Sequence, residues 1–522
     1  MSPARRTEPE PWGASALGLG RPAEVFPDPC LDSEQIADVG PATGSLGQKV
    51  GRGLGWSFLS NFINRLGSVV AGVVLARLLV PEDYGVFAVA LVVLGAGLSM
   101  NELGVSLAVV RWADGVDRIA PTVASMALAW SALLYAVCFA SAPLVANALN
   151  APDATPLIRV LSVCILIDAL AAVPAALITR HFMQGKRMAI DLTSFAAGTI
   201  VSIALAVGGL GAWCMVWGSV VSNVLAGLLT IAWAPQRFRP GFDRQAARSL
   251  LAFGLPLAGA SMLMFFMLNV DYLVVGHQLG ATQLGFYLLA FNLCSWPVNL
   301  ISIAVRRVSL AGFARVVGDP TRSGEAFSRS AGLVLALTVP LCVLVAAYAE
   351  PAVSFLYGDK WLPAVGALRL LCVLGGARVV LELAYDYLVA VGRTRLNLLL
   401  QALWVALLLP ALYAGAEWDG IRGVAMAHAV VAVGIVTPAF LLVLRSSSVN
   451  IKRLAQVATR PAFAGAAVFA SSWVVLHTMT GNITQLAVGG VVGLSLSAMI
   501  LAPMRELARS ARTSSVTIDA LP

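Results

Sequence analysis

Long apolar runs dominate this chain, separated by short stretches that hold most of its charge. A hydrocarbon core about 30 Å thick needs roughly 20 apolar residues for each helical crossing. Stretches of this length predict an all-α integral membrane protein with about 14 transmembrane helices. They lie near residues 56–78, 84–110, 119–147, 156–179, 189–208, 212–233, 250–275, 284–305, 327–349, 363–391, 396–415, 421–444, 461–479 and 483–502.

The composition points to a bilayer rather than to water. The 522 residues are 59% hydrophobic and only 12% charged, whereas soluble domains usually carry roughly 25% charged residues. The charge that is present lies mainly in the loops and gives a net charge of +8. A nucleic-acid site would need a basic patch with exposed aromatic residues on a soluble domain, and the sequence has none, so nucleic acid is excluded as a partner.

The lysines and arginines predict the orientation, because basic loops stay on the cytoplasmic side of a membrane. We expect residues 1–55 to be a disordered cytoplasmic tail, since they contain prolines, glycines and mixed charges but no apolar run. With this tail inside, the predicted outer loops hold only Arg77, Lys360 and Arg422. Both termini then lie in the cytoplasm, and residues 503–522 form a second tail.

Two similar stretches indicate an internal repeat. "VLARLLVPEDYGVFAVA" at 74–90 resembles "VVGHQLGATQLGFYLLA" at 274–290. Six predicted spans separate them, so the two copies point the same way across the membrane, as in transporters built from parallel repeats. We therefore expect two six-helix lobes, spans 1–6 (56–233) and spans 7–12 (250–444), with a cytoplasmic linker at 234–249 and spans 13 and 14 at 461–502. The matching residues are Val74, Leu79, Gly85 and Ala90 in the first copy, and Val274, Leu279, Gly285 and Ala290 in the second.

Three stretches also carry a family resemblance: "VLARLLVPEDYGVFAVALVVLGAGLSMNELGVSLAVVR", "YLLAFNLCSWPVNLISIAVRRVSLAGFARV" and "LYGDKWLPAVGALRLLCVLGG". Over about residues 50 to 445 the chain resembles the polysaccharide transporter (oligosaccharide flippase) family of the multidrug/oligosaccharidyl-lipid/polysaccharide flippase superfamily, in particular its colanic-acid and teichuronic-acid type exporters. The resemblance implies a V-shaped fold of two six-helix lobes in a bacterial inner (plasma) membrane. It also implies transfer of undecaprenyl-diphosphate-linked oligosaccharides from the inner to the outer leaflet for exopolysaccharide or lipopolysaccharide biosynthesis. A polysaccharide polymerase and glycosyltransferases are the further partners to expect.

Charged residues inside the bilayer are costly and tend to face a polar cavity. Arg65 in span 1, with Asn61 and Asn64 nearby, and Arg378 in span 10 are our candidates for binding a diphosphate, because a guanidinium offers forked donors and stays charged. Arg306, at the inner end of span 8, is a third. Arg378 has an alternative role, since Glu382 and Asp386 follow it at four-residue spacing and predict an internal row of ion pairs.

Three further acids, Glu102, Asp168 and Asp271, lie in predicted spans. They either partner the arginines, or carry a coupling proton or cation, or simply hold neighbouring helices together. Trp233 and Trp361, close to predicted span ends, are expected to anchor the chain at the membrane surface.

No motif predicts an enzyme. The seven cysteines include no CxxC pair and the four histidines show no ligand spacing. There is also no phosphate-binding loop for ATP. From these patterns we expect no metal and no cofactor. A polymerase or glycosyltransferase would need a large outer loop, whereas the longest outer connections, near 148–155 and 350–362, are short. A cation-coupled exporter of drugs or other small molecules with the same fold remains the main alternative.

Overall fold

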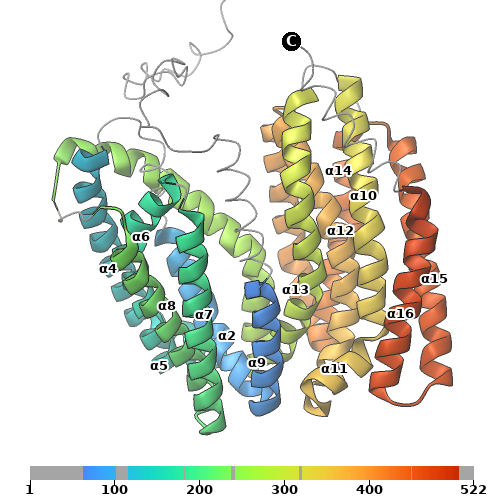
Figure 1. The fold of residues 1–522 in the computed structure, drawn as a ribbon, viewed down its shortest axis with the longest axis horizontal. Coiled ribbons are helices and arrows are strands. Elements are labelled where there is room, and N and C mark those ends of the chain that lie inside the picture. Colours follow the sequence, from blue (N-terminus) through green and yellow to red (C-terminus); the bar gives the residue numbers. More distant parts are fainter. Residues whose placement is uncertain are drawn as a thin grey trace, which may run out of the picture. The chain divides into compact units, whose positions relative to one another are not determined.

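The computed structural model describes residues 63–101, 116–181, 183–236, 241–316, 320–447 and 449–504; for 116–119, 504 and part of 245–322 it describes the backbone alone. The described residues are built from helices (Figure 1). A helix over residues 63–78 comes first. The others are α2 (Pro81–Asn101), α4 (Val116–Ala148), α5 (Ala154–Leu161), α6 (Val163–Arg180), α7 (Gln184–Val207), α8 (Trp213–Trp233), α9 (Arg244–Val316), α10 (Pro320–Ala347), α11 (Ala349–Tyr357), η2 (Asp359–Trp361), α12 (Ala364–Ala390), α13 (Thr394–Val430), η3 (Val431–Val436), α14 (Thr437–Arg445), α15 (Ile451–Thr478), α16 (Asn482–Leu501) and η4 (Ala502–Met504).

Eleven helical segments of the described chain are long and apolar enough to cross a membrane. This confirms an all-helical membrane protein, while the total of fourteen spans stays a prediction. Two of the segments are longer than one crossing. A straight helix of 73 residues, the length of α9, would be about 110 Å long, but Gly280 breaks it with a φ of 81°. α13 breaks in the same way at Asp419 and Gly420.

These breaks correct two predicted connections. We expected loops between spans 7 and 8 and between spans 11 and 12, but helical backbone continues to either side of one or two residues. Glycine makes such a sharp reversal possible because it has no Cβ to clash at positive φ. A third difference is α15, which begins at Ile451 rather than near 461, with the Asn450 side chain accepting a hydrogen bond from the Arg453 main-chain N–H as an N-cap.

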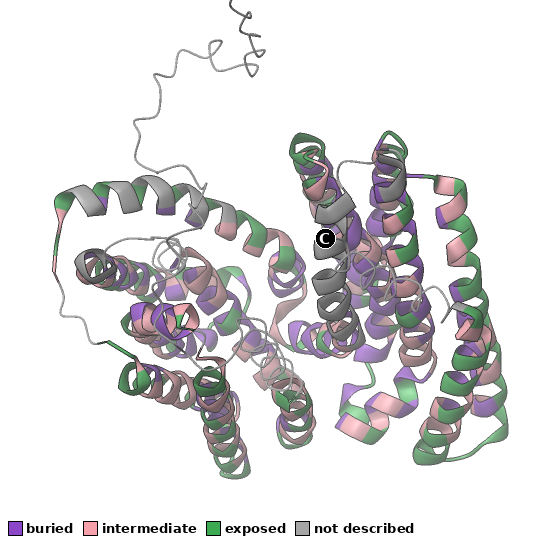
Figure 2. Cartoon of the chain, turned by 45° about the horizontal axis from the view of Figure 1, so that its top comes forward, coloured by how far each residue is buried: buried purple, intermediate pink, exposed green. Residues whose placement is uncertain are grey.

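Much of the exposed surface is apolar. Buried residues form stripes along the helices, and exposed faces run beside them (Figure 2). Large apolar side chains occur on these faces throughout, including Leu144, Ile200, Leu398, Leu442 and Phe463. A water-soluble chain rarely exposes so many, so the helices present these faces to lipid. Trp233 is 37% exposed, but Trp361 is completely buried, so the expected role of Trp361 as a surface anchor was wrong.

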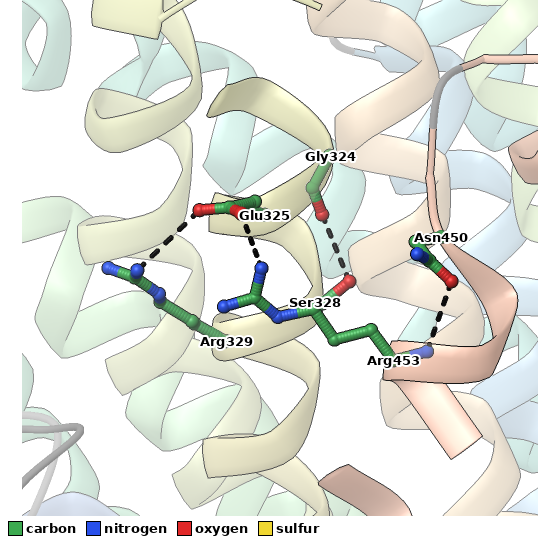
Figure 3. Close-up of polar contacts among 6 residues, drawn as sticks. All are labelled: Gly324, Glu325, Ser328, Arg329, Asn450 and Arg453. Atoms are coloured by element: carbon green, nitrogen blue, oxygen red, sulfur yellow. Dashed lines mark hydrogen bonds and ion pairs between the residues drawn. The ribbon is translucent and has the colours of Figure 1, made fainter. Parts of the chain in front are cut away.

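Polar contacts join segments that were predicted to lie on the same side of the membrane. On the predicted inner side, Glu325 at the start of α10 pairs with Arg329 and with Arg453 of α15 (Figure 3), and Arg393 donates to the Ser446 side chain and carbonyl. Further contacts join predicted outer loops: the Asn150 amide donates to the His277 carbonyl at 2.6 Å, Asp83 accepts from the Ala212 N–H, and Asn482 donates to Ser354. This agreement supports the predicted alternation of the spans.

The two copies of the predicted repeat meet at α2 and α9. A Cβ placed on Gly85 would lie 1.7 Å from the carbonyl oxygen of Ala281, and one on Gly285 would lie 2.0 Å from that of Pro81. These four residues occupy matching positions, 200 residues apart. The first helix group (63–78, α2 and α4–α8) and the second (α9–α14) therefore touch main chain to main chain, at equivalent points of the two copies.

We expect Gly85→Ala to destabilise the protein, because the new methyl group would overlap a main-chain oxygen that cannot move without shifting α9. Overpacking of this kind typically costs about 1–3 kcal/mol. Thermal unfolding of the purified protein in detergent would show it as a lower midpoint. Gly490→Ala in α16 is the matched control, since nothing lies within 4 Å of its added Cβ. Equal midpoints for both variants would contradict the close crossing.

Candidate functional site

A buried polar cluster lies in the second helix group. Asp271, in the first half of α9, is only 1% exposed. It accepts a hydrogen bond of 3.0 Å from the hydroxyl of Tyr287, beyond the Gly280 break, and its Oδ2 lies 4.0 Å from Nδ1 of His428 on α13. The break in α9 folds Tyr287 back beside Asp271, so residues 16 positions apart share one site.

Arg378 of α12 forms an ion pair on its own helix. Its Nε donates to Glu382 at 3.0 Å, one turn further along α12. Arg378 also lines a small pocket between α9 and α12, with Phe291, Ser295 and Leu374 among the other lining residues. Arg378 thus pairs with an acid of its own helix at the edge of this pocket.

A second polar cluster joins three helices of the first group. The Asn101 amide donates to Asp168 of α6 at 2.9 Å, and the Ser131 hydroxyl of α4 donates to the Asn101 side-chain oxygen. Trp130 adds a bond of 3.0 Å from its indole N–H to the Met100 carbonyl. Asp168 therefore has an amide as a partner. Buried polar groups need such partners, because leaving one unpaired in an apolar medium costs several kcal/mol.

Arg65 lies on the helix over 63–78 and is partly buried. Its Nε is buried and has no hydrogen-bond partner among the described residues. An unpaired guanidinium donor inside a protein is costly.

The remaining predicted residues divide into two sets. Asn64 is partly buried on the same helix as Arg65, and Asp386 is buried in α12. Asn61 and Glu102 lie outside the described residues, and Arg306 falls in the part of α9 whose side chains are not described.

Sequence reasoning missed Tyr287 and His428. His428 sits within an apolar run, and an ionisable residue in such a place is a signal for a functional or pairing role. Its partner could not be read from the sequence, since Asp271 lies 157 residues earlier and meets it only through the packing of α9 against α13.

Comparison with known proteins places the chain among polysaccharide biosynthesis proteins, whose family model matches residues 74–366. The succinoglycan biosynthesis transport protein ExoT of Rhizobium meliloti (strain 1021) is 29% identical over 354 residues, which is 66% of this chain and 70% of the relative. The lipopolysaccharide biosynthesis protein WzxC of Escherichia coli (strain K12) is 24% identical over 384 residues, 73% of this chain and 78% of the relative. The teichuronic acid biosynthesis protein TuaB of Bacillus subtilis (strain 168) is 22% identical over 342 residues, which is 64% of this chain and 69% of the relative.

Two solved structures share the fold. The lipid II flippase MurJ, in an inward closed conformation, matches with a TM-score of 0.68 at 14% identity over 86% of this chain and 99% of that one. An inward-facing multidrug resistance transporter of the MATE family matches with a TM-score of 0.58 at 17% identity, over 76% of this chain and 95% of that one. This likeness confirms the fold class expected from the sequence.

We expect Asn101→Ala to destabilise the first helix group, because it removes the partner of both Asp168 and Ser131. Leaving a buried polar group unpaired costs about 1–3 kcal/mol. Thermal unfolding in detergent would reveal the loss. Asn223→Ala is the matched control, since the Asn223 amide donates only to the Ser219 carbonyl of its own helix at 2.9 Å. A midpoint for Asn101→Ala no lower than that of the control would contradict a role in joining α2, α4 and α6.

Proposed function

The chain belongs to the family of polysaccharide biosynthesis proteins, and we propose that it is a flippase that moves undecaprenyl-diphosphate-linked oligosaccharide repeat units from the inner to the outer leaflet. The observation that carries this proposal is the family match over residues 74–366, which extends across both helix groups. The names of ExoT and WzxC associate those relatives with transport or biosynthesis of surface polysaccharides. The cargo here serves exopolysaccharide or other cell-surface polysaccharide biosynthesis.

The physics of the task agrees with the structure. A sugar head group cannot cross hydrocarbon unaided, so a carrier must provide polar groups inside the bilayer while the prenyl tail remains in lipid. The described chain is a multi-pass membrane protein with buried charged clusters. Alternating access requires the two helix groups to separate on one side at a time, and the contact at Gly85 and Gly285 is one of the places at which they meet on the predicted outer side.

In this proposal Arg65 and Arg378 neutralise the diphosphate, with Asn61, Asn64 and Arg306 as further contacts. A guanidinium suits this role because its donors match two phosphate oxygens at once. Asp271 beside His428 is the favoured coupling group for a proton or cation, ahead of Glu102 and Asp168, while Glu382 and Asp386 hold Arg378 in place. The unpaired Nε of Arg65 supports its assignment.

The proposal also covers organisation and location. The two lobes are 56–233 and 250–444, the linker is 234–249, and residues 461–502 add two spans. The protein lies in a bacterial inner or plasma membrane with residues 1–55 and 503–522 in the cytoplasm. It acts as a transporter rather than an enzyme, and it supplies a polymerase after glycosyltransferases have completed the repeat unit.

Depletion of the protein in its host tests the function directly. Mass spectrometry of lipid-linked sugars should show that a complete undecaprenyl-diphosphate oligosaccharide accumulates, and protection from periodate should place it on the inner leaflet. An unchanged pool of lipid-linked sugars in the depleted strain would contradict the flippase proposal.

The alternative is a cation-coupled exporter of drugs or other small molecules. The MATE transporter shares the fold with this chain, although its substrate does not transfer with the fold. This alternative predicts drug hypersensitivity of the depleted strain with a normal lipid pool, which the same strain would reveal.

Two charge-removing variants separate substrate binding from ion pairing at Arg378. If Arg378 binds the diphosphate, Arg378→Gln should lower export about tenfold or more, because hydrogen bonds to charged groups contribute about 1.5–3 kcal/mol. Glu382→Gln should lower it less. Export by each variant, measured in the depleted strain at equal membrane levels, gives the comparison. Recovery of export in the double variant would instead show that Arg378 serves only to pair with Glu382.

A further inference from the structure

Two of the three cations predicted on the outer side meet at one place. Arg77 lies near the end of the helix over 63–78, and Lys360 lies in η2, which links spans 9 and 10. Cations are scarce in outer loops, because the orientation of membrane proteins disfavours them there. Their meeting at the junction of the two helix groups therefore calls for a reason.

Each cation caps a helix of the opposite group. The Lys360 ammonium donates to the carbonyls of Arg77 and Leu79 at 3.0 and 2.6 Å, at the C-terminal end of the first helix. The Arg77 guanidinium donates in return to the carbonyls of Phe355 and Leu356, in the last turn of α11. The last carbonyls of a helix lack partners within the helix and carry partial negative charge, so cations are favoured there.

The buried indole of Trp361 fixes this junction. Its Nε1–H donates to the Ala76 carbonyl at 2.9 Å. Its ring meets those of Tyr84 and Phe286 edge to face, with centroids 5.1 and 5.9 Å apart. Tyr84 and Phe286 flank the crossing glycines of α2 and α9. The latch, which we define as Arg77, Lys360 and Trp361 with the carbonyls they contact, is thus part of the same closed contact as Gly85 and Gly285.

The two latch cations carry uncompensated charge. Among the described residues, no carboxylate lies within ion-pair distance of Arg77 or Lys360. Asp83 forms no ion pair with Lys360, and its oxygens accept from the main-chain N–H groups of Val80 and Ala212. Partial burial lowers the pKa of Lys360 below its ordinary value, and the charge of Asp83 acts in the opposite direction.

Arg422, the third predicted outer cation, differs in this respect. It pairs with Asp419 at 3.5 Å on its own helix, and its side chain is largely exposed. Its charge is already matched by a carboxylate, so it offers a natural comparison.

We propose that Arg77 and Lys360 form a binding site for the diphosphate of a prenyl lipid when the two helix groups separate on this side. In the closed state the two cations hold helix ends of the opposite group. Separation removes those carbonyls and leaves two cations, one on each side of the opening, with no carboxylate to replace them. A diphosphate carries full negative charges and is a stronger partner than a helix end, so the lipid stabilises the open state as it leaves. This inference rests on the proposed flippase function and extends it to the exit side.

Cross-linking of the full chain in nanodiscs tests this site. Asn150 and His277 are replaced by cysteine, because their contact joins the two helix groups on the same side as the latch. A short bifunctional thiol reagent links the two cysteines quickly when the groups are closed, so the rate of cross-linking reports the closed state. Cys30→Ser removes the cysteine outside the described residues, and the other six are buried. The added ligands are undecaprenyl diphosphate, undecaprenol and inorganic pyrophosphate.

Undecaprenyl diphosphate should slow cross-linking, whereas undecaprenol should not. The double variant R77Q/K360Q should need at least about tenfold more undecaprenyl diphosphate for the same slowing, because two charge-assisted contacts are lost. R422Q should respond as the parent does. If inorganic pyrophosphate slows cross-linking and undecaprenyl diphosphate does not, the site binds free diphosphate, and the assignment to a lipid would be overturned.

Two outcomes separate failure of this site from failure of the flippase function. An unaltered response in R77Q/K360Q would overturn the site and leave the latch as a purely structural cap. No response to undecaprenyl diphosphate in the parent would also overturn the site, whereas the flippase function is decided by the lipid-linked sugars of the depleted strain.

Discussion

The contact between α2 and α9 organises this protein. Main chain meets main chain because both crossing residues, Gly85 and Gly285, lack side chains, and a single added carbon would overlap a carbonyl oxygen on the other helix. Close approach of backbones through small residues is a general route to helix association in membranes, where the hydrophobic effect gives little help. The packing of Trp361 and the caps made by Arg77 and Lys360 follow from this contact.

Polar contacts within each helix group differ in kind from those between the two groups. Within each helix group, charged and amide side chains are joined across helices, as Asn101 joins α4 and α6 and as Asp271 meets His428. These contacts hold each group together as a unit. Between the groups on the predicted outer side, several bonds instead use main-chain carbonyls as acceptors.

Periodicity and length were enough to predict much of the fold. Apolar runs gave helices in nearly every expected place. The echo between residues 74–90 and 274–290 predicted a repeat, and the structure brings its two copies into contact at Gly85 and Gly285. Connections were the least predictable part, because the breaks at Gly280 and Asp419–Gly420 depend on single residues within continuous helical backbone. The role of Trp361 was also misjudged, since closeness to a span end does not reveal that another helix covers the ring.

The sequence by itself determined that this chain spans a membrane many times and which ionisable residues lie within its apolar runs. It could do so because hydropathy and spacing are local properties, fixed over about 20 residues. Only the tertiary structure decided which charges meet. Asp168 accepts a hydrogen bond from the Asn101 amide, Asp271 meets His428, and Arg77 and Lys360 each cap a helix of the opposite group. Those pairings join residues tens to hundreds of positions apart, and they depend on the depth and rotation of each helix, which packing alone sets.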